Sequence, residues 1–243
     1  MSNFDTAKQA ATDTERETAS RRAFLKMSVG GAVAGALGVA GAEMALPARV
    51  AAQSSLTPDA ALKELMEGNA RFAANKMTSF EHDVEMLKSK TVDKQEPFAA
   101  VLSCADSRVP VEILFDQTIG HVFVTRVAGN VVTPEIIGSL EYGAAVLGTK
   151  VILVIGHRGC GAVKAAIQGK GVPGQISSLF PHLQPAVDAA GPDTEATTKE
   201  NARIQARLLK ESSTVISEMV KAGTVKVVPA YYDLGTGAVT VLE

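Results

Sequence analysis

Three residues of the types that bind soft metal ions lie in two short polar motifs of this 243-residue chain. Cys104 opens the run Cys-Ala-Asp-Ser-Arg, and His157 and Cys160 lie in the run Gly-His-Arg-Gly-Cys-Gly. Two thiolates and one imidazole suit zinc, and three protein ligands leave a tetrahedral ion one open position. Such an open position is typical of catalytic rather than structural sites. The two motifs therefore predict a catalytic zinc centre.

Taken singly, the ligands have simpler explanations. A lone His157 is most often a hydrogen-bonded core residue, and a lone Cys104 behaves as a small buried hydrophobe. The chain has only two cysteines, so a single disulfide between them is a further alternative in an exported protein. No third cysteine exists to close a four-ligand cage, and the other histidines, His82, His121 and His182, lack ligand spacing. The two motifs together favour the zinc site over these alternatives.

The fold must bring the two motifs together, because they lie far apart in the sequence. Each motif directly follows an apolar run of strand length, at residues 98–103 and 150–155, and a further β-rich segment spans 121–127. Strands that are apolar throughout and alternate with helices predict an α/β fold with a mostly parallel sheet covered on both faces. Ligands gather at the C-terminal ends of such strands. Neighbouring strands would therefore bring both motifs into one crevice.

Other segments complete this α/β pattern without an internal repeat or a linker between domains. Thr57-Pro58 and Thr133-Pro134 each combine an N-cap with proline at the first helical position. Apolar periodicity predicts helices over residues 57–75, 133–147 and 177–190, a helix after Cys160, a longest helix over 197–221, and final strands over 225–232 and 238–242.

The N-terminal 52 residues are typical of an export signal rather than of a folded domain. Ser-Arg-Arg-Ala-Phe-Leu-Lys at 20–26 resembles a twin-arginine signal, and a weakly apolar run follows at 27–42. Val-Ala-Ala at 50–52 provides small residues at a cleavage site. We therefore expect residues 1–52 to be a removable signal peptide read by the twin-arginine translocation machinery. Residues 53–243 would then form the mature domain in the periplasm or outside the cell.

An uncleaved membrane anchor is the alternative for the apolar run. The run is rich in glycine and alanine and is shorter than the roughly 20 strongly apolar residues that span a bilayer. We therefore expect no stable membrane span after processing. The formal net charge of −2 provides no basic field for nucleic acid, so no nucleic-acid partner is expected.

The two metal motifs, at 104–109 and 156–161, resemble the zinc-site motifs of β-class carbonic anhydrases. The resemblance covers nearly all of the mature chain, including segments 68–72, 115–117, 126–130, 139–143 and 231–237. It implies a mostly parallel sheet with an antiparallel edge strand, flanked by helices. It also implies Zn²⁺ as cofactor, CO₂ and bicarbonate as ligands, and a homodimer or dimer of dimers whose N-terminal helix embraces the partner.

The implied reaction is the reversible hydration of CO₂ to bicarbonate and a proton by attack of zinc-bound hydroxide. Two thiolates and a neutral imidazole leave Zn²⁺ formally uncharged, so the zinc acidifies its water less than a centre with three histidines. As in the family, Arg108 would pair with Asp106 and keep it ionised, so that Asp106 accepts a hydrogen bond from the hydroxide. Activity is then expected to rise with pH. Gln117 and the N–H of Gly161 are the candidate donors to bicarbonate.

Three other functions compete with this interpretation. Related proteins of this fold hydrolyse carbonyl sulfide or carbon disulfide by the same attack, and pocket shape decides the preference. A non-catalytic zinc module would lack the Asp106–Arg108 pair, which is present here. A redox protein would use the two cysteines without zinc, but the chain has no Cys-x-x-Cys motif. The absence of tryptophan argues against the bicarbonate regulation of the family subgroup that uses one.

The export signal and the metal site are chemically connected. Two thiolates that share a zinc lie close enough to form a disulfide if the site is empty in an oxidising compartment. Twin-arginine transport carries folded proteins, so zinc would be loaded in the reducing cytoplasm before export.

Overall fold

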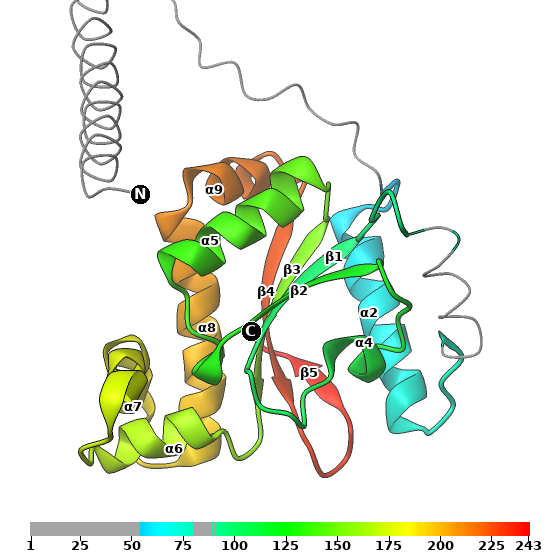
Figure 1. Ribbon diagram of the computed structural model, residues 1–243. Coiled ribbons are helices and arrows are strands. Elements are labelled where there is room, and N and C mark those ends of the chain that lie inside the picture. The colour runs from blue at the N-terminus through cyan, green and yellow to red at the C-terminus, as the bar shows by residue number, and fades with distance from the viewer. Residues whose placement is uncertain (1–53, 80–88, 90) are drawn as a thin grey trace, which may run out of the picture. The chain divides into compact units, whose positions relative to one another are not determined.

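A five-stranded sheet with helices on both faces forms the centre of the protein (Figure 1). The computed structural model describes residues 54–79, 89 and 91–243, so the predicted signal peptide lies outside the described residues. The strand order is β2-β1-β3-β4-β5. The strands are β1 (Ala99–Ser103), β2 (Val122–Arg126), β3 (Val151–His157), β4 (Lys226–Tyr232) and β5 (Val239–Val241).

Pairing in the sheet is parallel except at one edge. β1 pairs in parallel with β2 and β3, β3 pairs in parallel with β4, and β5 pairs antiparallel with β4. Every residue of β1 and β3 is buried, which explains why their sequences are apolar without alternation. The structure therefore confirms the predicted α/β class, including its antiparallel edge strand.

Helices cover both faces of the sheet. None of the described helices is long and apolar enough to cross a membrane. In chain order, the helical elements are α2 (Pro58–Ala73), α4 (Val111–Leu114), η2 (Ala128–Asn130), α5 (Pro134–Glu141), η3 (Tyr142–Val146), α6 (Gly161–Gln168), η4 (Gly174–Leu179), α7 (Phe180–Ala190), α8 (Thr194–Ser212) and α9 (Thr214–Lys221).

Alternate residues of the central strands build two separate cores. Val101 and Leu153 point into a core that α2 and α4 cover. Leu102 and Ile152 point into the opposite core, which α5, α8 and α9 cover. Figure 1 shows these two helical layers on either side of the sheet. Because the central strands are held from both faces, their C-terminal ends have fixed positions.

The prediction of a single helix over 197–221 is wrong in one respect. The chain forms two helices, α8 and α9, that meet at Ser213. Ser213 has extended backbone angles, and its hydroxyl accepts the N–H of Ile216 at 3.0 Å and donates to Glu141 at 2.6 Å. A side-chain cap therefore starts a new helix inside a stretch whose apolar periodicity is continuous.

Helix α2 follows the predicted start and packs closely against the chain after α4. The Thr57 hydroxyl accepts the N–H of Ala60 at 3.2 Å, and Pro58 is the first helical residue. Gly68 faces the carbonyl of Phe115 so closely that a Cβ there would lie 1.8 Å from that oxygen. Only a glycine therefore permits this approach.

We expect Gly68→Ala to lower the free energy of unfolding by about 3 kcal/mol or more, the upper range of overpacking, because the clash is with backbone atoms. Gly138→Ala is the matched control, since Gly138 lies within helix α5 and a Cβ there would meet nothing within 4 Å. That control should be neutral or slightly stabilising. Urea unfolding of both variants measures the difference, and equal stability of the two would contradict this packing.

Candidate metal centre

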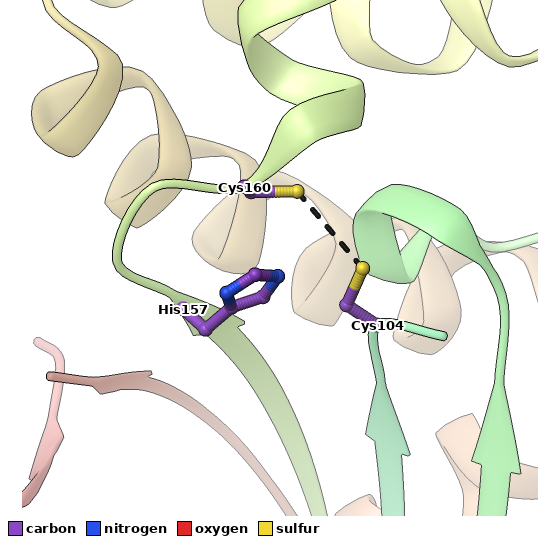
Figure 2. A group of neighbouring side chains, drawn as sticks. All are labelled: Cys104, His157 and Cys160. Atoms are coloured by element: carbon purple, nitrogen blue, oxygen red, sulfur yellow. Dashed lines mark hydrogen bonds between the residues drawn. The ribbon is translucent and has the colours of Figure 1, made fainter. Parts of the chain in front are cut away.

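The three predicted ligands converge at the C-terminal edge of the sheet (Figure 2). Cys104 directly follows β1, His157 is the last residue of β3, and Cys160 precedes the first residue of α6. One ligand atom from each residue lies within 4.8 Å of the other two, and the two sulfurs are 4.0 Å apart. The parallel pairing of β1 with β3 brings these residues together from distant parts of the chain.

Zinc fits this group of ligand atoms. A tetrahedral ion with zinc–sulfur bonds of about 2.3 Å places two sulfur ligands about 3.8 Å apart, close to the 4.0 Å between the sulfurs here. The Nδ1 atom of His157 lies 3.1 Å from the carbonyl of Arg158, which accepts its N–H. This hydrogen bond leaves the lone pair on Nε2, a buried atom with no hydrogen-bond partner among the described residues.

The electrostatics of the two cysteines also favour a cation. The neighbouring Cys160 thiol, helped by the N–H of Gly129, lowers the pKa of Cys104 to about 4. The same contact, with burial, raises the pKa of Cys160. The opposite shifts mean that a negative charge on one sulfur disfavours a second negative charge on the other. A divalent ion would neutralise both thiolates.

The turn that supplies two of the ligands is short and depends on glycine. Gly159 has φ +69°, a conformation that strains residues with a Cβ. Just before the turn, Gly156 faces Thr198 of α8, and a Cβ there would lie 2.8 Å from its methyl group and 2.9 Å from its carbonyl oxygen. Strand β3 can therefore approach α8 closely, which fixes the position of His157.

Asp106 and Arg108 form the predicted pair beside the ligands. Arg108 donates from Nε to Asp106 Oδ1 at 2.9 Å and from Nη2 to Oδ2 at 2.7 Å, and its backbone N–H also donates to Oδ1 at 2.9 Å. These bonds hold the pKa of the Asp106 carboxyl well below its usual range. Asp106 Oδ2 lies 3.8 Å from His157 Nε2, so an ionised carboxylate borders the space where the metal belongs.

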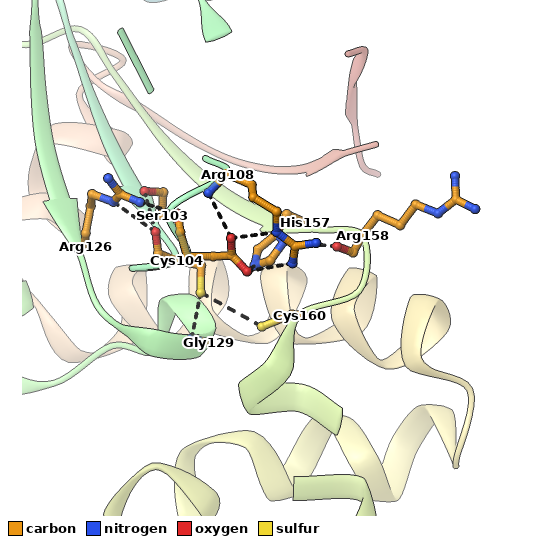
Figure 3. A network of polar contacts seen from close by, with 9 residues as sticks. Ser103, Cys104, Arg108, Arg126, Gly129, His157, Arg158 and Cys160 are labelled. Carbon is orange, nitrogen blue, oxygen red and sulfur yellow. Dashed lines mark hydrogen bonds and ion pairs between the residues drawn. The ribbon is translucent and has the colours of Figure 1, made fainter. Parts of the chain in front are cut away.

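Arg126 is a functional residue for which the sequence predicted no role. It ends β2 and donates from Nε to the carbonyl of Cys104 at 3.0 Å and from Nη2 to the carbonyl of Asp106 at 2.5 Å (Figure 3). In the β1–β2 register, Arg126 pairs with Ser103, the residue before Cys104. The guanidinium therefore holds the backbone of the first motif at two of its residues. Its signals in the sequence were its place at the end of a β-rich segment and within segment 126–130 of the family resemblance.

A second contact missing from the sequence prediction is made by Gly129. Its N–H donates to the Cys104 sulfur at 3.3 Å (Figure 3). Gly129 has φ +78°, and a Cβ there would lie 3.2 Å from Leu183. Glycine thus allows η2 to pack against Leu183 in the backbone conformation that this contact with the sulfur requires. Backbone donors of this kind carry no side-chain signal, so residue types could not reveal it.

The two predicted donors to bicarbonate have different surroundings. Gly161 is the first residue of α6, directly after Cys160, where a backbone N–H has no partner within the helix. Gln117 is buried, and its amide donates to the carbonyl of Phe115 at 3.1 Å and to Glu64 at 3.4 Å. Neither of these partners belongs to the metal group. The role of Gln117 in binding substrate stays a prediction, as does that of Gly161.

Asp116, which precedes Gln117, anchors a loop. Its carboxylate accepts from Arg71 at 2.5 Å and from the N–H and hydroxyl groups of Thr78 and Ser79. Burial alone would raise the pKa of Asp116, but these donors outweigh burial and lower it. This segment therefore ties α2 to the chain after α4.

The chain also matches known proteins in sequence. The family model described as carbonic anhydrase matches residues 99–239, a range that contains all three ligands. A carbonic anhydrase of Mycolicibacterium smegmatis is 36% identical over 190 residues, which cover 75% of this chain and 92% of that protein. The chain belongs to the carbonic anhydrase family.

Solved structures of the β class share the fold. The β-carbonic anhydrase of Coccomyxa, solved in complex with acetazolamide, superposes with a TM-score of 0.58 at 28% identity, covering 74% of this chain and 86% of that one. A tetrameric β-carbonic anhydrase of Sordaria macrospora superposes with a TM-score of 0.59 at 23% identity, covering 74% and 96%. β-Carbonic anhydrases use zinc, and the Cys-His-Cys group of this chain can hold it.

We expect the purified protein to bind one zinc per chain and Cys160→Ser to lose it. Removing a ligand should weaken zinc binding by more than the roughly 10–100-fold that is typical for an outer partner of a ligand. Competition with a chromophoric chelator measures this affinity, and circular dichroism checks the fold. His182→Ala is the control, because His182 lies outside the metal group. Unchanged zinc affinity in folded Cys160→Ser would contradict the ligand assignment.

Proposed function

We propose that this protein catalyses the reversible hydration of CO₂ to bicarbonate, with zinc held by Cys104, His157 and Cys160. The decisive observation is that the Cys-His-Cys group lies beside an ionised carboxylate that is held by an arginine. A purely structural zinc site has no use for such a carboxylate. Membership of the carbonic anhydrase family supports the same reaction.

Bound zinc supplies Lewis acidity, which makes water a nucleophile at neutral pH. Asp106 accepts a hydrogen bond from the attacking water and directs a lone pair of that water at the carbon of CO₂. Arg108 leaves Asp106 only this acceptor role, because its two guanidinium bonds keep the carboxylate ionised and fix its orientation. The N–H of Gly161 and the amide of Gln117 are proposed donors to the bicarbonate oxygens.

We expect Asp106→Asn to keep zinc and to hydrate CO₂ more slowly. An amide cannot accept both Arg108 bonds, and its NH₂ cannot accept a hydrogen bond from the attacking water. The expected loss in kcat/KM is about 10–100-fold, as for other partners of a metal centre. Stopped-flow CO₂ hydration and zinc stoichiometry, on the same preparation, measure the two effects.

Asp59→Asn is the matched control, because Asp59 is an exposed aspartate that pairs with Lys226 away from the metal group. It removes the same charge and should retain full activity. An Asp106→Asn enzyme with full zinc and full activity would refute the proposed role. If the wild-type protein is inactive on CO₂ but hydrolyses carbonyl sulfide or carbon disulfide, the proposed substrate is wrong and the sulfur compound takes its place.

We also propose that the chain assembles as a homodimer or a dimer of dimers. β2 is an edge strand with one side unpaired within the described sheet, and such edges are usually covered. Sedimentation equilibrium of the purified mature chain should give at least twice the monomer mass, and a monomer at micromolar concentration would refute the proposal.

Export by the twin-arginine route to the periplasm or beyond is a further proposal. It rests on the Arg21-Arg22 pair, the apolar run after it and the small residues before Gln53. The chemistry of the site supports it, because ligands from distant segments meet only in a folded chain. A route that carries folded proteins would deliver the site with its metal already bound.

We expect replacement of Arg21 and Arg22 by lysine to keep the protein in the cytoplasm of a bacterium that has this pathway. Arg16→Lys makes the same change outside the pair and should be exported normally. Cell fractionation with mass measurement of the exported form locates the protein and its cleavage point. Efficient export of the lysine pair variant, with full zinc, would argue against the route.

A further inference from the structure

Two buried amide side chains on α8 face the turn that contacts the Cys104 sulfur. Asn201 and Gln205 lie one helical turn apart and are almost completely inaccessible to solvent. Asn201 donates from Nδ2 to the carbonyl of Gly129 at 2.8 Å. Gln205 accepts the N–H of Val132 through Oε1 at 2.8 Å. The two amides thus hold the chain within η2 and just after it.

The amides also bind each other and a neighbouring helix. Gln205 Nε2 donates to Asn201 Oδ1 at 3.1 Å and to the carbonyl of His182 in α7 at 3.0 Å. All four polar side-chain atoms of the pair therefore have partners. Burying amides is costly unless they are bonded in this way, and a fully bonded pair fixes its geometry. The pair is thus a rigid clamp between α8, α7 and η2.

The clamp acts on the turn that approaches the metal ligands. Gly129 has both of its backbone polar groups engaged, the carbonyl by Asn201 and the N–H by the Cys104 sulfur. Holding the carbonyl side of this residue restricts its rotation, which keeps the N–H directed at the sulfur. Helix α8 also lies against Gly156, the residue before His157. Helix α8 therefore contacts the residues that position two of the three ligands, Cys104 and His157.

We propose that Asn201 and Gln205 are positioning residues of the zinc centre, which hold Gly129 so that its N–H donates to the Cys104 thiolate. This inference rests on zinc binding as part of the proposed function. A hydrogen bond to a ligand sulfur withdraws some of the negative charge that the thiolate gives to the metal. In a site with two thiolates, that withdrawal keeps zinc a stronger Lewis acid and keeps Cys104 correctly oriented.

A purely structural role for the pair makes a different prediction, and Asn69 provides the comparison. Asn69 is also a buried asparagine with three backbone partners, since it donates to the carbonyls of Leu114 and Gly237 and accepts from Val239. It connects α2 to the β5 side of the protein, and none of its partners belongs to the metal group. Loss of Asn69 should therefore reduce stability without affecting the metal.

The test uses the protein loaded with cobalt(II), whose sulfur-to-metal charge-transfer absorption reports the thiolates directly. We expect Asn201→Ala to shift this absorption to longer wavelength, because a thiolate without its N–H donor gives up an electron more easily. Zinc release to an excess of chelator should become about tenfold faster in the same variant, because Cys104 is no longer held in its orientation. Asn69→Ala should show neither change, although thermal unfolding should show that it is destabilised.

Two further variants keep the test decisive if Asn201→Ala does not fold. Gln205→Ala removes the hold on Val132, and Gly129→Ala strains the turn itself, so both should give the same direction of shift. An unchanged absorption and release rate in the folded variants, or equal changes in Asn69→Ala, would overturn the proposal. The readouts do not involve CO₂, so an inactive wild type with these shifts would refute the proposed reaction and leave the positioning role standing.

Discussion

Two buried sulfurs 4.0 Å apart are the constraint around which the rest of the site is arranged. As thiolates they would repel each other in a low-dielectric environment, and as thiols they would not bind zinc. A metal cation between the two sulfurs removes the repulsion and is bound by both thiolates. The unpaired Nε2 atom of His157 faces the same space. The parallel β1–β3 pair, with a core on each face, holds the three groups at this distance.

Most contacts that support this centre involve a backbone group. Arg126 holds the carbonyls of Cys104 and Asp106, and the carbonyl of Arg158 accepts from His157. Gly129 reaches the Cys104 sulfur with an N–H. Backbone groups have fewer degrees of freedom than long side chains, so a site held in this way needs little reorganisation when it binds metal or substrate. The Asn201–Gln205 clamp on α8 in turn holds the backbone of Gly129.

Much of the fold was predictable because its determinants are local. Helices begin at Pro58 and Pro134, where proline and periodicity indicated, although Thr57 caps its helix through its side chain and Thr133 does not. The apolar runs became the buried strands. The break at Ser213 was missed, since an apolar face that continues through a cap gives no interruption in periodicity. The cap is visible only once Ser213 is seen to bond Ile216 and Glu141.

The sequence by itself determined the ligand types, the Asp106–Arg108 pair and the strand ends that carry them, because each of these lies within one short motif. Tertiary structure alone decided the roles of Arg126, Gly129 and Asn201 and gave Gln117 its contacts with Glu64 and Phe115. The physical reason is the distance along the chain between partners such as Asn201 and Gly129. Their hydrogen bonds depend on strand register and on how α8 packs, and neither residue types nor periodicity specifies those.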